Sequence, residues 1–220
     1  MQLIDQFRRG INGPLAEFFL SSLTTSEGIH NDIIRKALCQ QGVLHDLVKL
    51  LTPQPDAVDI RMISMQCILH FVEHEDSYTS IKTASAVRKL VAILESKEKE
   101  LCYMAAEVLA SFVHAPLLCE VMLSNENMSI ESLASHLRNY TKDHTVDPGP
   151  VLRVLRSLAA QDPWRNAIMG HEDLYNLVDG ISRSATAPPD VQQQASDVMV
   201  LLVCRSSIAQ RIAKVLPFSI

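Results

Sequence analysis

The stretch Gly42–Leu51, with the sequence GVLHDLVKLL, carries an apolar pattern that recurs along the chain. Its apolar side chains stand three and four residues apart, the spacing that gathers them on one face of an α-helix. The corresponding helices are centred on leucines separated by 43, 43 and 44 residues, namely Leu47, Leu90, Leu133 and Leu177. A period of about 40 to 47 residues is typical of solenoids built from groups of helices. The pattern therefore predicts an all-α protein whose repeats stack to bury a shared core.

Each central helix is preceded by a shorter helix and followed by a longer one. We expect the short helices at 33–40, 78–84, 116–123 and 163–169, and the long helices at 58–73, 101–114, 150–160 and 191–205. Prolines lie near several helix starts, where the first turn tolerates them. The predicted organisation is a single domain with repeats at about 29–76, 77–115, 116–162 and 163–205, and with partial repeats at 1–28 and 206–220. The last partial repeat is predicted to open with a short helix at 207–215.

The composition fits a helical array in an intracellular protein. Hydrophobic residues make up 47% of the chain, whereas glycine occurs only seven times and aromatics make up 5%, which favours helices over a strand-rich fold. The net charge of −5 provides no basic footprint for nucleic acid. The longest apolar run, 198–204, is far shorter than the ~20 residues that span a bilayer. The five cysteines are odd in number and widely spaced, which indicates reduced core thiols and a cytoplasmic or nuclear location.

Two segments resemble the armadillo repeat family. Gly42 followed by Val43–Leu51 looks like the glycine-led second helix of that repeat, and Ala105–Val113, AAEVLASFV, resembles the pattern of its third helix. The similarity covers most of the chain. It implies a right-handed α-solenoid of about four three-helix repeats, in which the long third helices line a concave groove.

Aligning the four long helices identifies side chains that would face this groove. The helices align on Ile68, Leu109, Leu155 and Met199. One ladder of groove positions is then Gln66, Glu107, Arg153 and Asp197, the other, one helical turn later, is His70, Ser111, Ser157 and Leu201, and the equivalents in the first partial repeat are Phe18 and Ser22. In importin-alpha such positions carry tryptophan and asparagine, which hold a basic peptide. Neither residue type occurs in these ladders, which argues against nuclear-import cargo as the ligand.

These features predict a non-catalytic protein-interaction scaffold that binds an extended peptide or a helix of a partner protein along the groove. Two alternatives stay open. One is a co-chaperone resembling the armadillo nucleotide-exchange factors of seventy-kilodalton heat-shock chaperones. The other is a structural module that stacks end to end, because solenoid ends without a polar cap favour self-association.

Few residues are spaced for chemistry. Cys67, His70 and His74 share a helical face at a spacing that can bind zinc, although a further ligand would have to come from another element. We expect Cys67 to be buried and the histidines to face the groove. The sequence has neither a glycine-rich phosphate loop nor a nucleophile elbow, so no metal, cofactor or enzymatic activity is expected. The single tryptophan, Trp164, begins a short helix and is expected to pack in the core.

Overall fold

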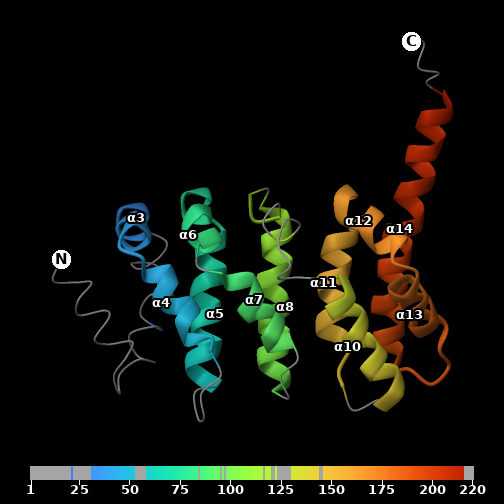
Figure 1. The fold of residues 1–220 in the computed structure, drawn as a ribbon, viewed down its shortest axis with the longest axis horizontal. Helices are drawn as coiled ribbons and strands as arrows, with labels where there is room; N and C mark the ends of the chain where they lie inside the picture. The colour runs from blue at the N-terminus through green and yellow to red at the C-terminus, as the bar shows by residue number, and fades with distance from the viewer. Residues whose placement is uncertain are drawn as a thin grey trace. The chain divides into compact units, whose positions relative to one another are not determined.

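The computed structural model describes residues 21, 31–52, 58–83, 85–94, 96, 98–115, 117–119, 122, 130–143 and 146–215. For 82, 83, 143 and 204–215 the description covers the backbone alone. Every regular element within these ranges is a helix (Figure 1). The chain divides into two compact units, Met1–Met128 and Ser129–Ile220. The predicted partial repeat 1–28, apart from residue 21, and half of the predicted short helix 116–123 lie outside the described residues.

The first unit repeats one order of short, medium and long helices. Its described helices are α3 (Asp32–Gln40), α4 (Val43–Leu50), α5 (Val58–Val72), the 3-10 helix η1 (Glu75–Ser77), α6 (Tyr78–Thr83), α7 (Ala86–Leu94) and α8 (Lys99–His114). The medium helix α4 packs against α3 and α5, α7 packs against α8, and the long helices α5 and α8 pack against each other. In Figure 1 these helices follow one another from blue to green. The bounds of the α-helices lie within two residues of the predicted ones.

The second unit has five described helices. They are α10 (Ile130–Asp143), α11 (Gly149–Ala159), α12 (Asp162–Gly170), α13 (Glu172–Arg183) and α14 (Pro189–Val215). Its predicted medium helix, α10, continues past Leu137 to Asp143 and, with 14 residues, is longer than the 11-residue helix that follows it. Helix α13 packs against α10 and α14, and α11 packs against α12 and α14. Arg138 on α10 forms ion pairs with Asp173 on α13 and with Glu131. The Nδ1 atom of His171 caps α13 by accepting a hydrogen bond from the Leu174 amide at 3.2 Å. The ion pair of Arg138 with Asp173 connects the medium helices of successive repeats.

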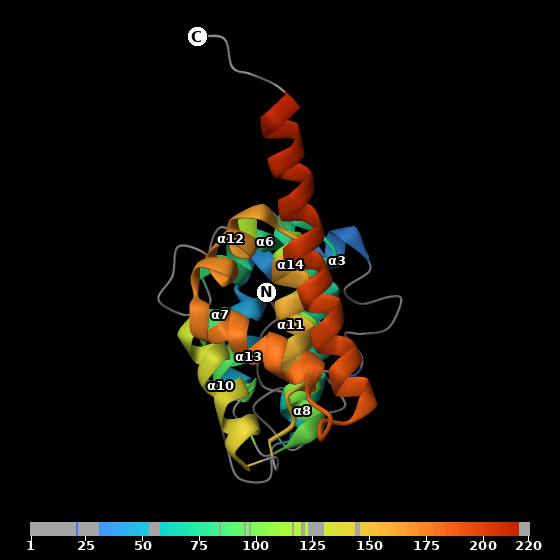
Figure 2. The ribbon, with the colours of Figure 1, turned by 90° about the vertical axis from the view of Figure 1, so that its right-hand side faces the viewer.

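One predicted helix boundary is wrong. The pattern predicted a long helix that ends at 205 and a separate short helix at 207–215, whereas α14 continues without interruption to Val215. No glycine or proline stands between 191 and 216 to end the helix. In both views the C-terminal part of α14 extends beyond the other helices of its unit (Figures 1 and 2).

The predicted apolar centres form the core, with one exception. Leu47, Leu90 and Leu133 are at most 1% exposed. Leu177 is only half-buried, whereas the buried residues of α13 are Leu174, Val178 and Ile181. Helix α13 belongs to the last described repeat and packs chiefly against α10, α12 and α14. The face of α13 that carries Leu177 is therefore partly open to solvent.

Both medium helices of the first unit begin after a residue in the left-handed conformation. Gly42 precedes α4 with φ of 76°, and Ser85 precedes α7 with φ of 57°, 43 residues later. Glycine adopts this conformation without a steric penalty because it has no Cβ, whereas a serine there is strained. The armadillo resemblance rests partly on a glycine at the start of the second helix. In this chain the left-handed backbone conformation of Gly42 explains the glycine at that position.

The four cysteines whose side chains are described form no disulfide, and two of them lie in the core. Cys67 and Cys102 are buried as predicted, whereas Cys39 and Cys119 are half-buried. The Sγ atom of Cys102, on α8, donates to the carbonyl oxygens of Ile93 at 3.4 Å and Ser96 at 3.2 Å. This thiol therefore contacts the C-terminal end of α7. Cys204 lies beyond the described side chains.

Candidate peptide-binding surface

In the first unit, the predicted groove residues lie on two long helices that pack against each other. Gln66 on α5 is exposed, His70 on α5 is 30% exposed, and Glu107 and Ser111 on α8 are half-buried. The other faces of these helices are in the core, where Ile68 and Leu109 are fully buried. We call the two groove side chains that lie one turn apart on one long helix a rung. Because α5 packs against α8, the four polar side chains form two adjacent rungs.

Hydrogen bonds and charge define the chemistry of this first pair of rungs. The hydroxyl of Ser111 donates to the Glu107 carbonyl oxygen at 3.1 Å, so this bond does not involve the Glu107 carboxylate. The Nδ1 atom of His70 lies 3.8 Å from the Glu73 carboxylate, which forms an ion pair only with protonated histidine. Glu73 is exposed and shares the helical face of Gln66 and His70. Sequence reasoning missed Glu73, although its spacing of seven residues from Gln66 was a usable signal.

The second unit brings together the other predicted groove residues. Arg153 is exposed and Ser157 half-buried on α11, while Asp197 and Leu201 are half-buried on α14. These two long helices pack against each other. The Gln193 side chain donates to one oxygen of Asp197 at 2.8 Å.

Sequence reasoning also missed an ion pair between α11 and α14. Nη1 of Arg156 lies 3.7 Å from Oδ2 of Asp197, with the arginine side chain 63% exposed. Arg156 follows Arg153 by three residues, which places both guanidinium groups on one side of α11. On the exposed face of α11 the charged side chains are therefore Arg153 and Arg156, and Asp197 on α14 already has a cationic neighbour. Phe18 and Ser22 lie outside the described residues, and a ladder continuous across all four repeats stays a prediction.

The predicted zinc-binding face consists of Cys67, His70 and His74. Its burial is that of a helix face that packs in the protein. Cys67 is fully buried, and burial raises the pKa of its thiol to about 12, so the thiolate that binds metals is absent near neutral pH. The two histidines are half-buried rather than exposed. Within the described ranges, no group of three or more histidine, cysteine and acidic side chains is placed to hold a metal ion. Trp164 is 3% exposed and packs in the core as predicted.

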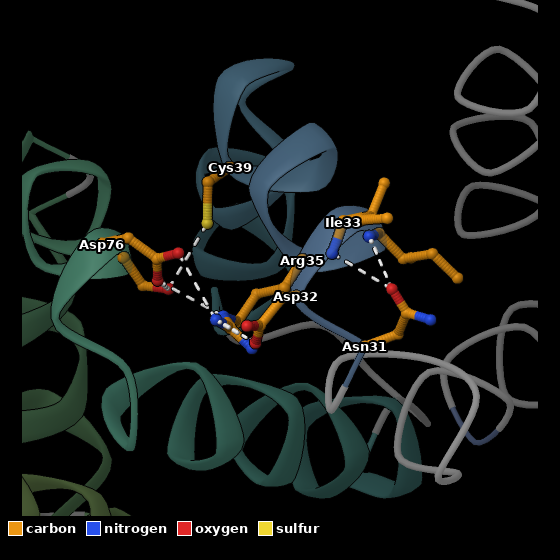
Figure 3. A network of polar contacts seen from close by, with 8 residues as sticks. Asn31, Asp32, Ile33, Arg35, Cys39 and Asp76 are labelled. Atoms are coloured by element: carbon orange, nitrogen blue, oxygen red, sulfur yellow. Dashed lines mark hydrogen bonds and ion pairs between the residues drawn. The ribbon is translucent and has the colours of Figure 1, made fainter.

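A second polar cluster connects the short helices of the first two repeats (Figure 3). Arg35 on α3 is 4% exposed; its Nε lies 3.3 Å from Oδ1 of Asp76 and its Nη2 lies 2.8 Å from Oδ1 of Asp32. Burial alone would lower the pKa of Arg35, but the hydrogen bonds to Asp76 and Asp32 outweigh it and raise that pKa. The Cys39 thiol donates to the Ser77 hydroxyl at 3.4 Å. This cluster holds successive repeats together.

The repeated short, medium and long helices, with packed third helices, define an armadillo-like α-solenoid. Similar solved structures bear this out. A designed armadillo repeat protein matches with a TM-score of 0.63 and 16% identity over 89% of this chain and 80% of its own. A second designed armadillo repeat protein, in complex with the peptide (KR)4, matches with a TM-score of 0.57 and 13% identity over 90% of this chain and 86% of its own. An engineered protein matches with a TM-score of 0.61 and 18% identity over 89% of this chain and 77% of its own.

Comparison of the sequence with family models and with curated proteins gives no match. The identities of 13 to 18% with the solved structures show the fold alone. A separate finding concerns membranes: among the described helices, none is both long and apolar enough to cross one.

Proposed function

We propose that this protein is a non-catalytic interaction scaffold whose long helices bind an extended segment of a partner protein. The supporting observation is the arrangement of α5 with α8 and of α11 with α14. Each pair buries one face and presents polar side chains in neighbouring rungs on the other. One designed protein of the same fold is in complex with the peptide (KR)4, which supports an extended peptide as the kind of ligand.

The charges of the two units suggest the pattern of that ligand. On the first unit the acidic side chains Glu73 and Glu107 accompany Gln66 and His70. On the second unit Arg153 and Arg156 are the exposed charges on α11, and Asp197 is paired with Arg156. Complementary charge sets the register and direction of binding more than its strength. We therefore propose a ligand with a basic block for the first unit and an acidic block for the second.

The distance between packed helices sets how many ligand residues pass each long helix. Packed helices lie roughly 8–10 Å apart, and an extended chain advances ~3.3 Å per residue. About three ligand residues therefore pass each long helix, and two adjacent rungs can engage side chains of the same peptide.

A labelled peptide with a lysine-arginine block and an aspartate-glutamate block provides the test. Fluorescence anisotropy would compare the two block orders with a peptide of the same composition in which the charges alternate. We expect the wild-type protein to bind one block order best. In the double variant Glu107→Arg with Arg153→Glu, affinity for that order should fall about tenfold or more, and the preference should pass to the opposite order.

The matched control makes the same charge changes on the medium helix α13, with Glu172→Arg and Arg183→Glu, two exposed side chains. Its binding should equal that of the wild type, and thermal melts should show both double variants to be folded. Equal binding of all three peptides by the wild type, or equal binding by the folded groove variant, would refute the proposed surface.

A further inference from the structure

Helix α8 carries an aromatic side chain on the face of the proposed peptide surface. Tyr103 precedes Glu107 by four residues and Ser111 by eight, so the three side chains follow one side of the helix. Tyr103 is half-buried, whereas Phe71 on α5 and Phe112 on α8 are fully buried. Among the described side chains of the four long helices, no other residue is aromatic. Tyr103 is therefore the aromatic ring of these helices that a ligand can reach from solvent.

A cation within the chain already covers the face of this ring. Nζ of Lys99 lies 5.7 Å from the centroid of the Tyr103 ring, within the ~6 Å over which an aromatic ring attracts a positive charge. Lys99 precedes Tyr103 by four residues, about one turn of α8. The ring is thus oriented so that its face meets a positively charged group.

The position of Lys99 favours exchange of its ammonium for another cation. Lys99 is the first residue of α8 and is exposed. A cation in the first turn of a helix opposes the positive end of the helix dipole, so Lys99 gains little from its place in the helix. A lysine side chain also loses conformational entropy when it is held over a ring. Both effects weaken the contact of Lys99 with Tyr103.

Glu107 provides a carboxylate beside this ring. It is half-buried and lies one turn after Tyr103. The Ser111 hydroxyl donates to the main-chain carbonyl oxygen of Glu107 rather than to its carboxylate. A guanidinium group suits this pair of side chains better than an ammonium, because its flat face stacks on an aromatic ring while its N–H groups donate to a carboxylate.

We propose that Tyr103 is an arginine-binding position of the peptide surface. An arginine from the basic block of the ligand stacks on the ring in place of Lys99 and pairs with the carboxylate of Glu107. This inference rests on the proposed function, since the contact lies within the same surface. It adds the identity of a ligand residue, because the ring selects arginine over lysine whereas a carboxylate alone accepts either.

In this arrangement Lys99 competes with the ligand for the ring. While its ammonium covers Tyr103, the ligand has to displace it, which lowers the measured affinity. Removing the ammonium should therefore strengthen binding, and the gain should require Tyr103. A general repulsion between Lys99 and a basic ligand would also weaken binding, but that repulsion does not depend on the ring. Dependence on Tyr103 separates the two effects.

Fluorescence anisotropy with two labelled peptides tests the contact. Both peptides have the block order that the wild type binds best, and their basic blocks contain either arginine alone or lysine alone. The wild type should bind the arginine peptide roughly two- to fivefold more tightly. In Tyr103→Leu this preference should disappear, whereas in Tyr103→Phe it should persist because the ring remains. Circular dichroism should show both variants to be folded, since each keeps an apolar side chain at this half-buried position.

Lys99→Gln, at an exposed position, provides a second measurement. Its affinity for the arginine peptide should rise roughly two- to fivefold over that of the wild type. The same substitution in the Tyr103→Leu background should leave the affinity unchanged. Lys49→Gln is the matched control, because it removes one positive charge from a side chain that is 73% exposed on α4, and it should bind like the wild type.

The outcomes distinguish this contact from the surface to which it belongs. Equal affinities of the wild type for the two peptides would overturn the assignment of Tyr103. So would an arginine preference that persists in Tyr103→Leu, or an equal gain from Lys99→Gln in both backgrounds. In each of these cases a preference for one block order would leave the peptide surface itself standing. A wild type that binds both block orders equally would refute the surface and this contact with it.

Discussion

Lys89 on α7 reaches back to Val48 in the preceding repeat, where its Nζ donates to the carbonyl oxygen at 2.9 Å. The same Nζ donates to the Thr52 hydroxyl at 2.8 Å. Val48 lies in the last turn of α4, and its carbonyl oxygen also accepts a hydrogen bond from the Leu51 amide at 3.2 Å. Burial and the nearby charge of Lys49 lower the pKa of Lys89. A single lysine thus links the end of one medium helix to the next medium helix.

Replacing Lys89 with methionine should therefore destabilise the first unit. Methionine keeps most of the aliphatic stem but removes both hydrogen bonds, so we expect a loss of about 1 kcal/mol in the free energy of unfolding, measured by urea denaturation. Lys49→Met is the matched control, because Lys49 is 73% exposed and forms only a surface pair with Asp46. The control should change stability by less than about 0.5 kcal/mol. Equal losses in the two variants would contradict a special role for Lys89.

The ion pair between Asp76 and Arg35 should make stability depend on acidity. Burial alone would raise the pKa of Asp76, but its hydrogen bond with Arg35 and the positive charges of that arginine and its neighbours hold this pKa below its usual value. A lowered carboxyl pKa stabilises the fold above the unfolded value of ~3.9, and the contribution disappears as pH falls through the folded pKa.

Asp76→Asn should accordingly cost roughly 1–3 kcal/mol near neutral pH, since the buried Arg35 loses a charged partner. The difference from the wild type should shrink as pH falls below ~4. Denaturation curves measured from neutral to acid pH would show this convergence. Asp46→Asn, which removes an exposed pair with Lys49, should show a small difference at every pH. A gap between Asp76→Asn and the wild type that stays constant with pH would exclude the ion pair as its cause.

The helices were predictable because apolar periodicity reports directly on burial. The three- and four-residue spacing around Leu47 and Leu90 fixed both the helix type and the buried face. Contacts between repeats were not predictable in this way. The bridge from Arg156 to Asp197 and the pair of Arg35 with Asp76 join residues 41 positions apart in sequence, and no periodic pattern marks which side chains will meet. The length of α14 was missed because serines at 206 and 207 resemble a turn but do not force one.

Ser85 provides a test of the left-handed position before α7. Ser85→Gly should stabilise the protein by about 1 kcal/mol, because glycine relieves the clash of Cβ at φ of 57°. The serine is exposed, so the substitution opens no cavity. The reverse change one repeat earlier, Gly42→Ser, should destabilise by a similar amount. Thermal unfolding of both variants checks the prediction, and a loss of stability in Ser85→Gly would show that the serine side chain contributes more than its strain costs.

The half-buried position of Leu177 predicts an unequal response of equivalent leucines to truncation. Leu90 is fully buried, so Leu90→Ala should cost about 2–5 kcal/mol through lost burial and a residual cavity. Leu177→Ala should cost less than about half of that, because part of this side chain is already in water and its removal leaves an open surface instead of a cavity. Chemical denaturation at one protein concentration, low enough to limit self-association, measures both. Equal losses would mean that Leu177 is buried in solution.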